Sequence, residues 1–335
     1  MNVTHAAITR HFFAWCLSTG AKLPKPLNIS RRVNGLRGLF SLAHIERGEL
    51  IAAVQQKQRL TMSTVSTFPV IPSHRALLEA SKMAADPGIE ALIPVMRMAL
   101  FCCLEIGKDL QSPWEPWLSV LDEEDWDDDQ IKREFFSLFD QWEQEHYSVL
   151  RTQFSTVITN ICEYIESEHP DLPVTAALLR RIFRLVLARV VPTPDPRHHL
   201  VRRFYEIINP AKSREEVLHH VSMIPLIDLV NHSSTPNVTV KETPEWIELR
   251  ALSQISPGHE LCAYYALPAD KAASLCKYGF VPHISTGSTL VDSFDEYYTK
   301  GAKPNLTHKD PAIIEKERRL NEEVQRLLRV FKNQE

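Results

Sequence analysis

Glycine is scarce in this chain and unevenly placed. Only 10 of the 335 residues are glycine, and Gly88 and Gly107 are the only two between Glu49 and Pro257. Tight turns with positive φ favour glycine, because a side chain is strained in that conformation. The long middle therefore lacks the residues that frequent β-turns would use. We expect a mostly helical middle between two β-rich ends.

Other features are also missing. The six cysteines include no Cys-x-x-Cys pair, which favours reduced thiols in the cytoplasm or nucleus over a disulfide framework. No segment reaches the roughly 20 uncharged apolar residues of a membrane span. The formal net charge is −4, so no basic face for direct nucleic-acid binding is expected. The adjacent histidine pairs at 198–199 and 219–220 lack ligand spacing, and we predict no metal site.

The N-terminal segment combines an amphipathic pattern with a basic charge. Ile8, Phe12 and Trp15 recur at helical spacing, which predicts a helix over Ile8–Leu17 that ends near Gly20. No acidic residue precedes Glu46, so a mitochondrial presequence is an alternative to the cytoplasmic or nuclear location.

The spacing of apolar residues and the positions of turn residues predict the remaining strands and helices. We expect strands over 39–42 and 50–54 with a turn at 46–49, so that they form a hairpin, and a second hairpin from 238–240 and 246–252. A further strand is expected over 261–265. Helices are expected over 91–107, 131–168 and 174–191, and over the C-terminal segment that follows Asp310-Pro311. At 335 residues, the chain is long enough for one large or two ordinary domains.

Polar side chains concentrate between Ile224 and Tyr278. Asn231-His232-Ser233 ends the apolar run from Ile224 to Val230, and Tyr264-Tyr265 and Tyr278 follow. Tyr264 and Tyr265 would point to opposite faces of a strand, so we interpret Tyr264 as a packing residue. This stretch is the candidate site.

The order of the motifs resembles the SET-domain methyltransferases, in particular the group of the Rubisco large-subunit lysine methyltransferase. The resemblance covers most of the chain. It rests on Phe12-x-x-Trp15 with Gly20-Ala21, Gly35-Leu36-Arg37-Gly38-Leu39, Ser112-Pro113-Trp114-Glu115-Pro116-Trp117, Ala188-Arg189, Pro225-x-x-Asp228-x-x-Asn231-His232-Ser233, Gly258-x-Glu260, and the spacing from Tyr265 to Tyr278-Gly279-Phe280.

The resemblance implies an α+β fold, in which a β-rich SET core (a β-clip) is interrupted by a helical insert. The core would comprise 1–58, with the N-terminal helix, and 224–282. The insert would be 59–223, and 283–335 would form a reduced C-terminal substrate-binding or tail region with one helix. The Asn-His-Ser and tyrosine segments would pass one another in a knot-like crossing.

The resemblance also implies a function, namely transfer of a methyl group from S-adenosylmethionine to a lysine of a protein, with a non-histone substrate expected. Tyr265 would be the catalytic tyrosine, which also lines the cofactor site, and Tyr278 the second aromatic of the lysine channel. Asn231 would hold the zwitterionic end of the cofactor, since its amide both donates and accepts. His232 would contact adenine through its backbone.

Other positions follow from the same resemblance. Gly35 and Arg37 fall where the hairpin backbone would meet the cofactor, and Arg189 would pair with the cofactor carboxylate. Asp228 would brace the Asn231 segment. Ala266 stands where the Rubisco enzyme has an acidic residue. Two alternatives to lysine methylation stay open: histidine methylation, and a SET-fold binding module with little turnover.

Overall fold

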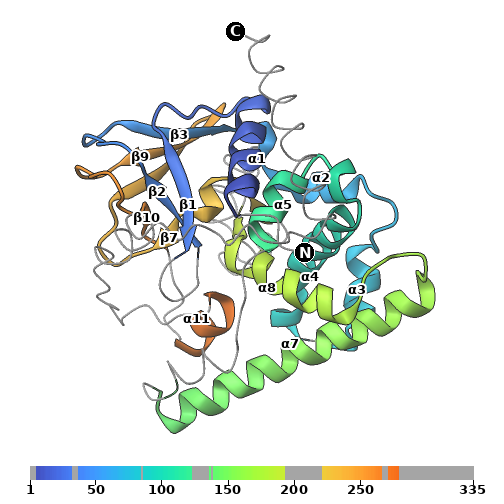
Figure 1. Ribbon diagram of the computed structural model, residues 1–335. Coiled ribbons are helices and arrows are strands. Elements are labelled where there is room, and N and C mark those ends of the chain that lie inside the picture. The colour runs from blue at the N-terminus through green and yellow to red at the C-terminus, as the bar shows by residue number, and fades with distance from the viewer. Residues whose placement is uncertain are drawn as a thin grey trace, which may run out of the picture.

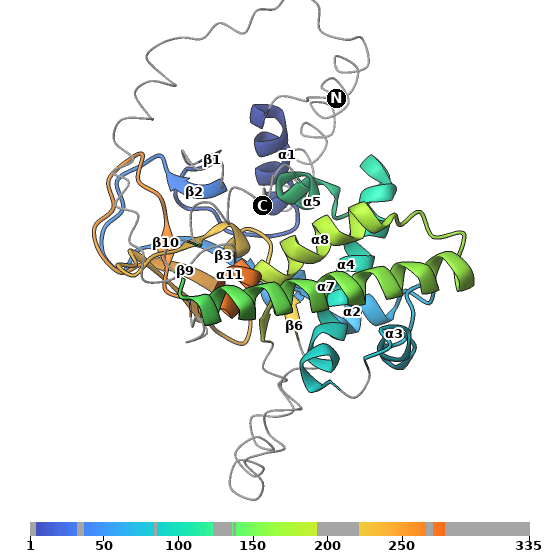
Figure 2. The same cartoon turned by 90° about the horizontal axis from the view of Figure 1, so that it is seen from below.

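The computed structural model describes residues 5–31, 37–83, 86–122, 136, 139–192, 221–265 and 271–278. Gly35, Ala266 and the predicted C-terminal region 283–335 with its helix lie outside these residues. The predicted α+β fold is confirmed, with small sheets on one side of the molecule and helices on the other (Figures 1 and 2). Among the helices described, none is long and apolar enough to cross a membrane.

Four small sheets form the β part of the described chain. Strand β1 pairs antiparallel with β2, and β9 lies between β3 and β8 in a three-stranded sheet. Strand β6 lies between β4 and β5, and β7 pairs with β10. The strands are β1 (Leu27–Arg31), β2 (Arg37–Ser41), β3 (Leu50–Gln55), β4 (Leu60–Thr61), β5 (Val191–Pro192), β6 (Val221–Met223), β7 (Asn231–His232), β8 (Val238–Glu242), β9 (Trp246–Ala251) and β10 (Cys262–Ala263).

The hairpin predicted from 238–252 is confirmed, whereas the one predicted from 39–54 is wrong. Strands β2 and β3 belong to different sheets, because β2 pairs with β1 and β3 with β9. The turn between them instead joins the loop after β9, since the backbones of Ile45 and Ile255 exchange two hydrogen bonds of 2.9 Å. Strand β3 thus pairs with the distant β9 and not with the neighbouring strand that the turn residues indicated.

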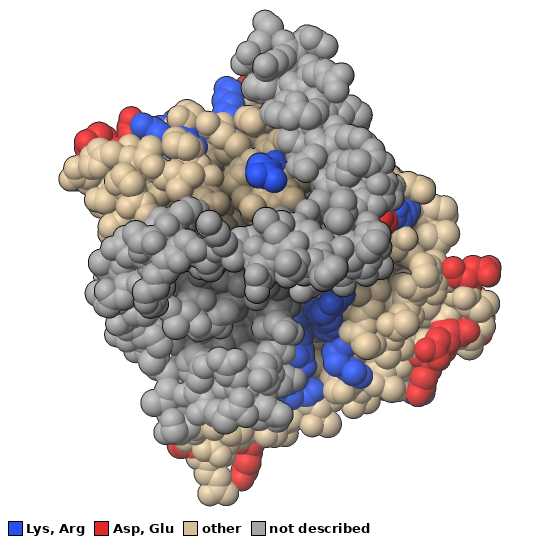
Figure 3. Space-filling model, in the orientation of Figure 1, with Lys and Arg blue, Asp and Glu red and all other residues tan. Residues whose placement is uncertain are grey.

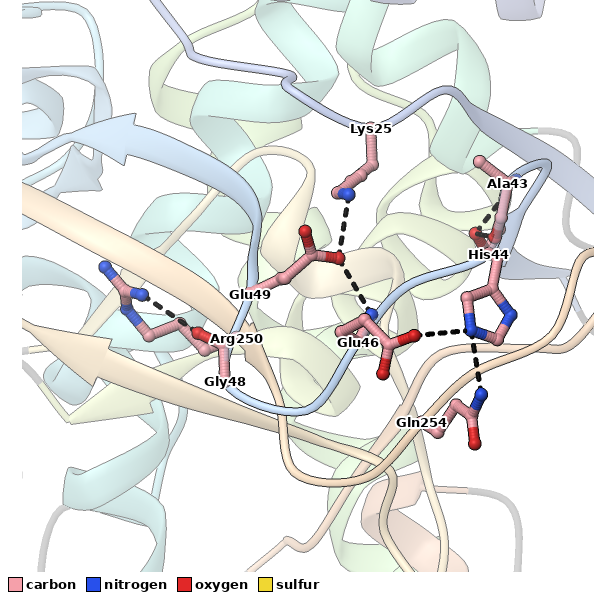
Figure 4. Close-up of polar contacts among 9 residues, drawn as sticks. Lys25, Ala43, His44, Glu46, Gly48, Glu49, Arg250 and Gln254 are labelled. Carbon is pink, nitrogen blue, oxygen red and sulfur yellow. Dashed lines mark hydrogen bonds and ion pairs between the residues drawn. The ribbon is translucent and has the colours of Figure 1, made fainter.

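Side chains hold this turn in place (Figure 4). Glu49 Oε2 receives Lys25 Nζ at 2.7 Å and the backbone N–H of Glu46 at 2.8 Å. On the opposite side of the turn, Arg250 Nη1 donates to the Gly48 carbonyl at 3.1 Å. Gly48 has φ +85°, a conformation that favours glycine.

Among the described residues, the helices other than α1 and α11 belong to the middle of the chain, as the glycine distribution predicts. The helical elements are α1 (His5–Ser18), η1 (Gln56–Gln58), α2 (Met62–Ser66), α3 (His74–Ala80), α4 (Pro87–Gly107), η2 (Asp109–Gln111), α5 (Glu115–Asp122), α7 (Gln141–Glu168), α8 (Ala176–Arg189), η4 (Ile227–Leu229) and α11 (Lys271–Tyr278). Capping side chains start the long ones: Asp86 accepts from the N–H of Gly88, and Asp140 from that of Glu143.

Helix α1 confirms the prediction for Ile8–Leu17 and extends it by a few residues at its N-terminus. Phe12 and Trp15 are buried in the main core, and Gly20 follows the helix with φ +96°. The indole N–H of Trp15 donates to the Pro113 carbonyl at 2.9 Å. The N-terminal helix is thereby joined to the middle of the chain.

The middle enters and leaves the core through one sheet. Strand β4 precedes the helices, β5 follows α8, and β6 pairs with both, so that Leu60 faces Met223 and Val191 faces Ser222. The predicted insert limits, 59 and 223, fall at this sheet. A separate apolar cluster joins the start of α7 to α11 through Phe139, Tyr147, Ala272, Leu275 and Cys276. The helix that ends in Tyr278 therefore rests on α7.

Candidate active site

Two short strands bring the candidate site together. Strand β7 runs parallel to β10, with Asn231 opposite Cys262 and His232 opposite Ala263. Asn237 secures the pair, because its Oδ1 accepts the N–H of Cys262 at 2.8 Å and its own N–H donates to the Cys262 carbonyl at 3.0 Å. The Asn-His-Ser segment and the tyrosine segment thus lie side by side, as predicted.

Tyr265 is held at both its backbone and its hydroxyl. Its backbone N–H donates to His232 Nδ1 at 3.0 Å, and its hydroxyl donates to the Val230 carbonyl at 2.5 Å. Burial raises the pKa of the phenol above its ordinary value of 10.0; nearby Arg189 partly opposes this shift, and Tyr278 adds to it. The hydroxyl therefore stays protonated at neutral pH, with its proton directed at a carbonyl.

The side chain of His232 supports this arrangement. Burial lowers its pKa below the ordinary value of 6.5, so the ring is neutral at pH 7. Because Nδ1 accepts from Tyr265, the ring proton resides on Nε2. The ring lies against the rings of Tyr264 and Tyr265, with centroids 5.5 and 5.4 Å away. The imidazole thus positions Tyr265, in agreement with a structural role for the side chain.

Asn231 links the two halves of the core. Its Nδ2 donates to the Arg37 carbonyl at 2.5 Å and to Glu260 Oε1 at 2.8 Å. Both amide hydrogens point to oxygens of the protein, one on β2 and one just before β10. Asn231 is only partly buried, so this polar cluster is reachable from the surface.

Glu260 also belongs to the cluster, although the sequence motifs do not indicate it as a site residue. It is buried, and a Cβ added to Gly38 would overlap with Glu260 Oε1 and lie 3.1 Å from Asn231 Nδ2. Gly38 is therefore needed because the carboxylate occupies the space of a side chain. The signal in the sequence was Gly258-x-Glu260, but only the fold shows that its carboxylate meets Asn231.

Arg37 faces away from this cluster. Its side chain is 2% exposed, and its Nη1 donates to the carbonyl of Val120 on α5. The backbone carbonyl of Arg37 does reach the site, where it accepts from Asn231. The contribution of Arg37 to a cofactor site would thus come from its backbone, while its side chain connects the core to the insert.

The two remaining tyrosines differ in their surroundings. The ring of Tyr278, at the end of α11, lies 5.5 Å from that of Tyr265, at 46°. The Nζ atom of Lys277 lies 4.8 Å from the centroid of the Tyr278 ring. Tyr264 is 68% exposed, and its ring packs against that of His232 at the surface, with the centroids 5.5 Å apart. The strand ends at Ala263 and does not carry it inward.

Arg189 ends helix α8, and its charge reaches the site. Its Nη1 donates to the Leu185 carbonyl at 3.2 Å, and its charge acts on Tyr265. The helix also carries Arg180, Arg181 and Arg184 and no acidic residue; Figure 3 shows basic side chains gathered where α8 lies. Of these cations, Arg189 is the one whose charge acts on the site, and a guanidinium suits a carboxylate ligand.

Asp228 lies between the site and the insert. Its Oδ2 accepts the indole N–H of Trp117 at 3.0 Å, and it precedes Asn231 by three residues. A bracing role was expected for Asp228, and its partner proves to be a residue of the Ser-Pro-Trp-Glu-Pro-Trp motif. Within the described ranges, no cluster of three or more His, Cys, Asp or Glu side chains could hold a metal ion.

Comparison with known proteins agrees with this geometry. The family model of the SET domain matches residues 36–266. The N-lysine methyltransferase SETD6 of Bos taurus is 22% identical over 272 residues, which cover 77% of this chain and 54% of the relative. The N-lysine methyltransferase setd6 of Salmo salar is 23% identical over 276 residues, with the same coverage of both chains. This chain therefore spans about half the length of the curated relatives that it matches.

A solved structure shares the fold. The SET domain of LSMT, bound to lysine and AdoHcy, superposes with a TM-score of 0.55 at 16% identity, over 89% of this chain and 65% of that one. The Rubisco LSMT structure bound to AdoMet gives a TM-score of 0.53 at 17% identity, over 88% of this chain and 64% of that one. At these identities the likeness establishes the architecture only.

Proposed function

The chain belongs to the SET-domain family, and from this premise we propose that it transfers methyl groups from S-adenosylmethionine to lysine side chains of a protein, with a non-histone substrate expected. The observation that carries the proposal is the convergence of Asn231, Glu260 and Tyr265 at the parallel pair of β7 and β10. Two relatives are named N-lysine methyltransferases, which supports the choice of lysine as the acceptor.

The residues present fit the amino-acid end of S-adenosylmethionine. That end carries an ammonium and a carboxylate. Glu260 and the Arg37 carbonyl are acceptors beside Asn231, and these are the groups that an ammonium needs. Arg189 supplies a cation close enough to act on Tyr265, and a guanidinium binds a carboxylate in a bidentate manner. We infer that these residues hold the cofactor.

S-adenosylmethionine would supply a methyl group on a positively charged sulfur, and the chain supplies positioning. Bringing two reactants into one geometry accounts for much of the acceleration of such a displacement. The attacking lysine must be neutral, and removal of an amine from water disfavours its charged form. The two aromatic rings of Tyr265 and Tyr278, with centroids 5.5 Å apart, support such a desolvated channel.

The hydroxyl of Tyr265 has a defined part in this scheme. Its proton is donated to the Val230 carbonyl, so its oxygen lone pairs are left to accept an N–H of the incoming amine. Because burial raises its pKa, the phenol does not act as the base that takes the lysine proton at neutral pH. We infer that Tyr265 orients the amine and that Tyr278 forms a second wall of the channel.

Methylation of a cell extract tests this proposal. Purified protein is incubated with methyl-labelled S-adenosylmethionine and extract, and the labelled proteins are hydrolysed to identify the modified amino acid. We expect methyl-lysine with the wild type and on the order of 10²-fold less with Tyr265→Phe. If methylhistidine were found instead, the acceptor would be histidine and the lysine assignment would be wrong. Absence of S-adenosylmethionine binding in calorimetry would favour a binding module. The cytoplasmic or nuclear location stays a prediction from the sequence.

A further inference from the structure

Helix α5 of the insert contacts two residues that adjoin Asn231, Asp228 in sequence and Arg37 through a hydrogen bond. In the first contact, the indole N–H of Trp117 donates to Asp228 Oδ2 at 3.0 Å. In the second, the Val120 carbonyl accepts from the Arg37 guanidinium. Trp117 and Val120 are three residues apart, about one turn of the same helix.

These contacts close a ring through Asn231. The Asn231 amide donates to the Arg37 carbonyl, and the Arg37 side chain reaches Val120. One turn of α5 leads from Val120 to Trp117, and the indole leads to Asp228. Three residues of chain then return to Asn231. Because the two ends of the ring start from one helix, a shift of α5 would act on both neighbours of Asn231, Arg37 and Asp228.

The segment that leads into the ring has a strained backbone. Leu226 has φ +74° and ψ −48° and is 0% exposed. A buried leucine adopts this conformation only where its surroundings impose it. Asp228 follows two residues later, so its bond to Trp117 is a contact that can hold the strained turn. Trp117 itself is 0% exposed, so the surrounding side chains hold its indole N–H in position.

We infer that the hydrogen bond from Trp117 to Asp228 is the contact by which the helical insert positions Asn231 for its ligand, an inference that rests on the proposed function for the identity of that ligand. Trp117 and Asp228 are positioning residues. They bond to each other, whereas Asn231 and its neighbours would contact the cofactor. The Ser-Pro-Trp-Glu-Pro-Trp motif acquires a role in the insert that goes beyond core packing.

The test compares two tryptophans whose indole N–H groups bridge the insert to another part of the chain. Trp117→Phe removes the donor to Asp228. Trp15→Phe is the matched control, because it removes a donor to the Pro113 carbonyl of the same insert, at 2.9 Å. Hydrogen–deuterium exchange of residues 224–233 and calorimetric titration with S-adenosylmethionine are measured on the full chain. We expect faster exchange and about tenfold weaker binding with Trp117→Phe, and neither with Trp15→Phe.

A second pair of variants tests the chemistry of the contact. Asp228→Asn retains an acceptor for the indole, whereas Asp228→Ala removes it. We expect Asp228→Asn to keep most of the exchange protection and affinity, and Asp228→Ala to lose both. Equal losses in these two variants, or equal changes in the two tryptophan variants, would overturn the inference.

The two proposals fail in different ways. If the wild type does not bind S-adenosylmethionine, the proposed function fails, and the exchange of residues 224–233 in the ligand-free protein still decides the positioning role. If the wild type binds and Trp117→Phe leaves both exchange and affinity unchanged, the positioning role fails alone.

Discussion

The hydroxyl of Tyr265 donates its hydrogen bond to the carbonyl of Val230, 35 residues earlier in the chain. Val230 is the last residue before the Asn-His-Ser tripeptide, so the candidate catalytic group and the candidate cofactor segment are fastened to each other directly. A substitution that moves Tyr265 should therefore also move the Asn-His-Ser segment, and the reverse.

Removal of the Tyr265 hydroxyl should abolish most of the activity. Tyr265→Phe keeps the ring beside Tyr278 but loses the group that orients the amine. We expect the rate of methyl transfer to fall on the order of 10²-fold, the effect of a misplaced reactant, while binding of S-adenosylmethionine persists. Tyr264→Phe is the control, since that side chain is exposed and its rate should match the wild type. A rate loss shared by both variants would contradict the assignment.

A methyl group at position 38 should displace the side chains of Asn231 and Glu260, which are candidates for cofactor binding. In Gly38→Ala the new Cβ would overlap with Glu260 Oε1, so the carboxylate and Asn231 must move. We expect a loss of roughly 1–3 kcal/mol in the free energy of unfolding, typical of overpacking, together with weaker binding of S-adenosylmethionine. Urea titration and calorimetry measure the two effects.

Gly107→Ala is the matched control for that substitution. Gly107 ends α4, and its nearest contact for a new Cβ is an ordinary one of 3.6 Å with Pro173 Cγ. We expect a change between zero and a gain of about 1 kcal/mol, because alanine is favoured over glycine in helices. If Gly38→Ala and Gly107→Ala lost similar amounts of stability, contact with Asn231 and Glu260 would not be the cause of the loss.

Neutralisation of Glu260 should weaken cofactor binding more than it weakens the fold. Glu260→Gln retains an oxygen for Asn231 Nδ2, but it loses the charge that would face the cofactor ammonium. We expect the dissociation constant for S-adenosylmethionine to rise about tenfold, with the melting temperature nearly unchanged. In Glu248→Gln, which alters the carboxylate partner of Arg250 on β9, affinity should stay at the wild-type value.

Stability should depend on pH through His232. Burial lowers the pKa of His232 from its ordinary value of 6.5, so the unfolded chain binds a proton that the folded chain does not. The free energy of unfolding therefore falls as the pH drops below about 6.5, and this contribution is constant above it. His232→Asn offers an amide oxygen to the Tyr265 N–H and cannot titrate. Urea titrations at pH 7.5 and 5 should show a larger loss in the wild type than in the variant.

Much of the architecture was predictable because it rests on local patterns. The scarcity of glycine between Glu49 and Pro257 correctly predicts a helical middle. The spacing of Ile8, Phe12 and Trp15 predicts α1, and the strand and turn residues of 238–252 predict the hairpin of β8 and β9. The motifs that carry Asn231, His232, Tyr265 and Tyr278 were sufficient to identify the family.

The tertiary structure alone decided how these residues meet. Strands β7 and β10 have two residues each, too few for any periodic pattern, and their pairing places Tyr265 on Val230 and His232. The pairing of β3 with β9 overrode the local turn, because backbone groups of a buried strand must find partners wherever the sheet offers them. Asn231 meets Glu260 and Arg37 across 29 and 194 residues. The sequence by itself determined the candidates Asn231, His232, Tyr265 and Tyr278 but not Glu260, and long-range packing determined their partners, since hydrogen bonds between distant segments leave no local pattern.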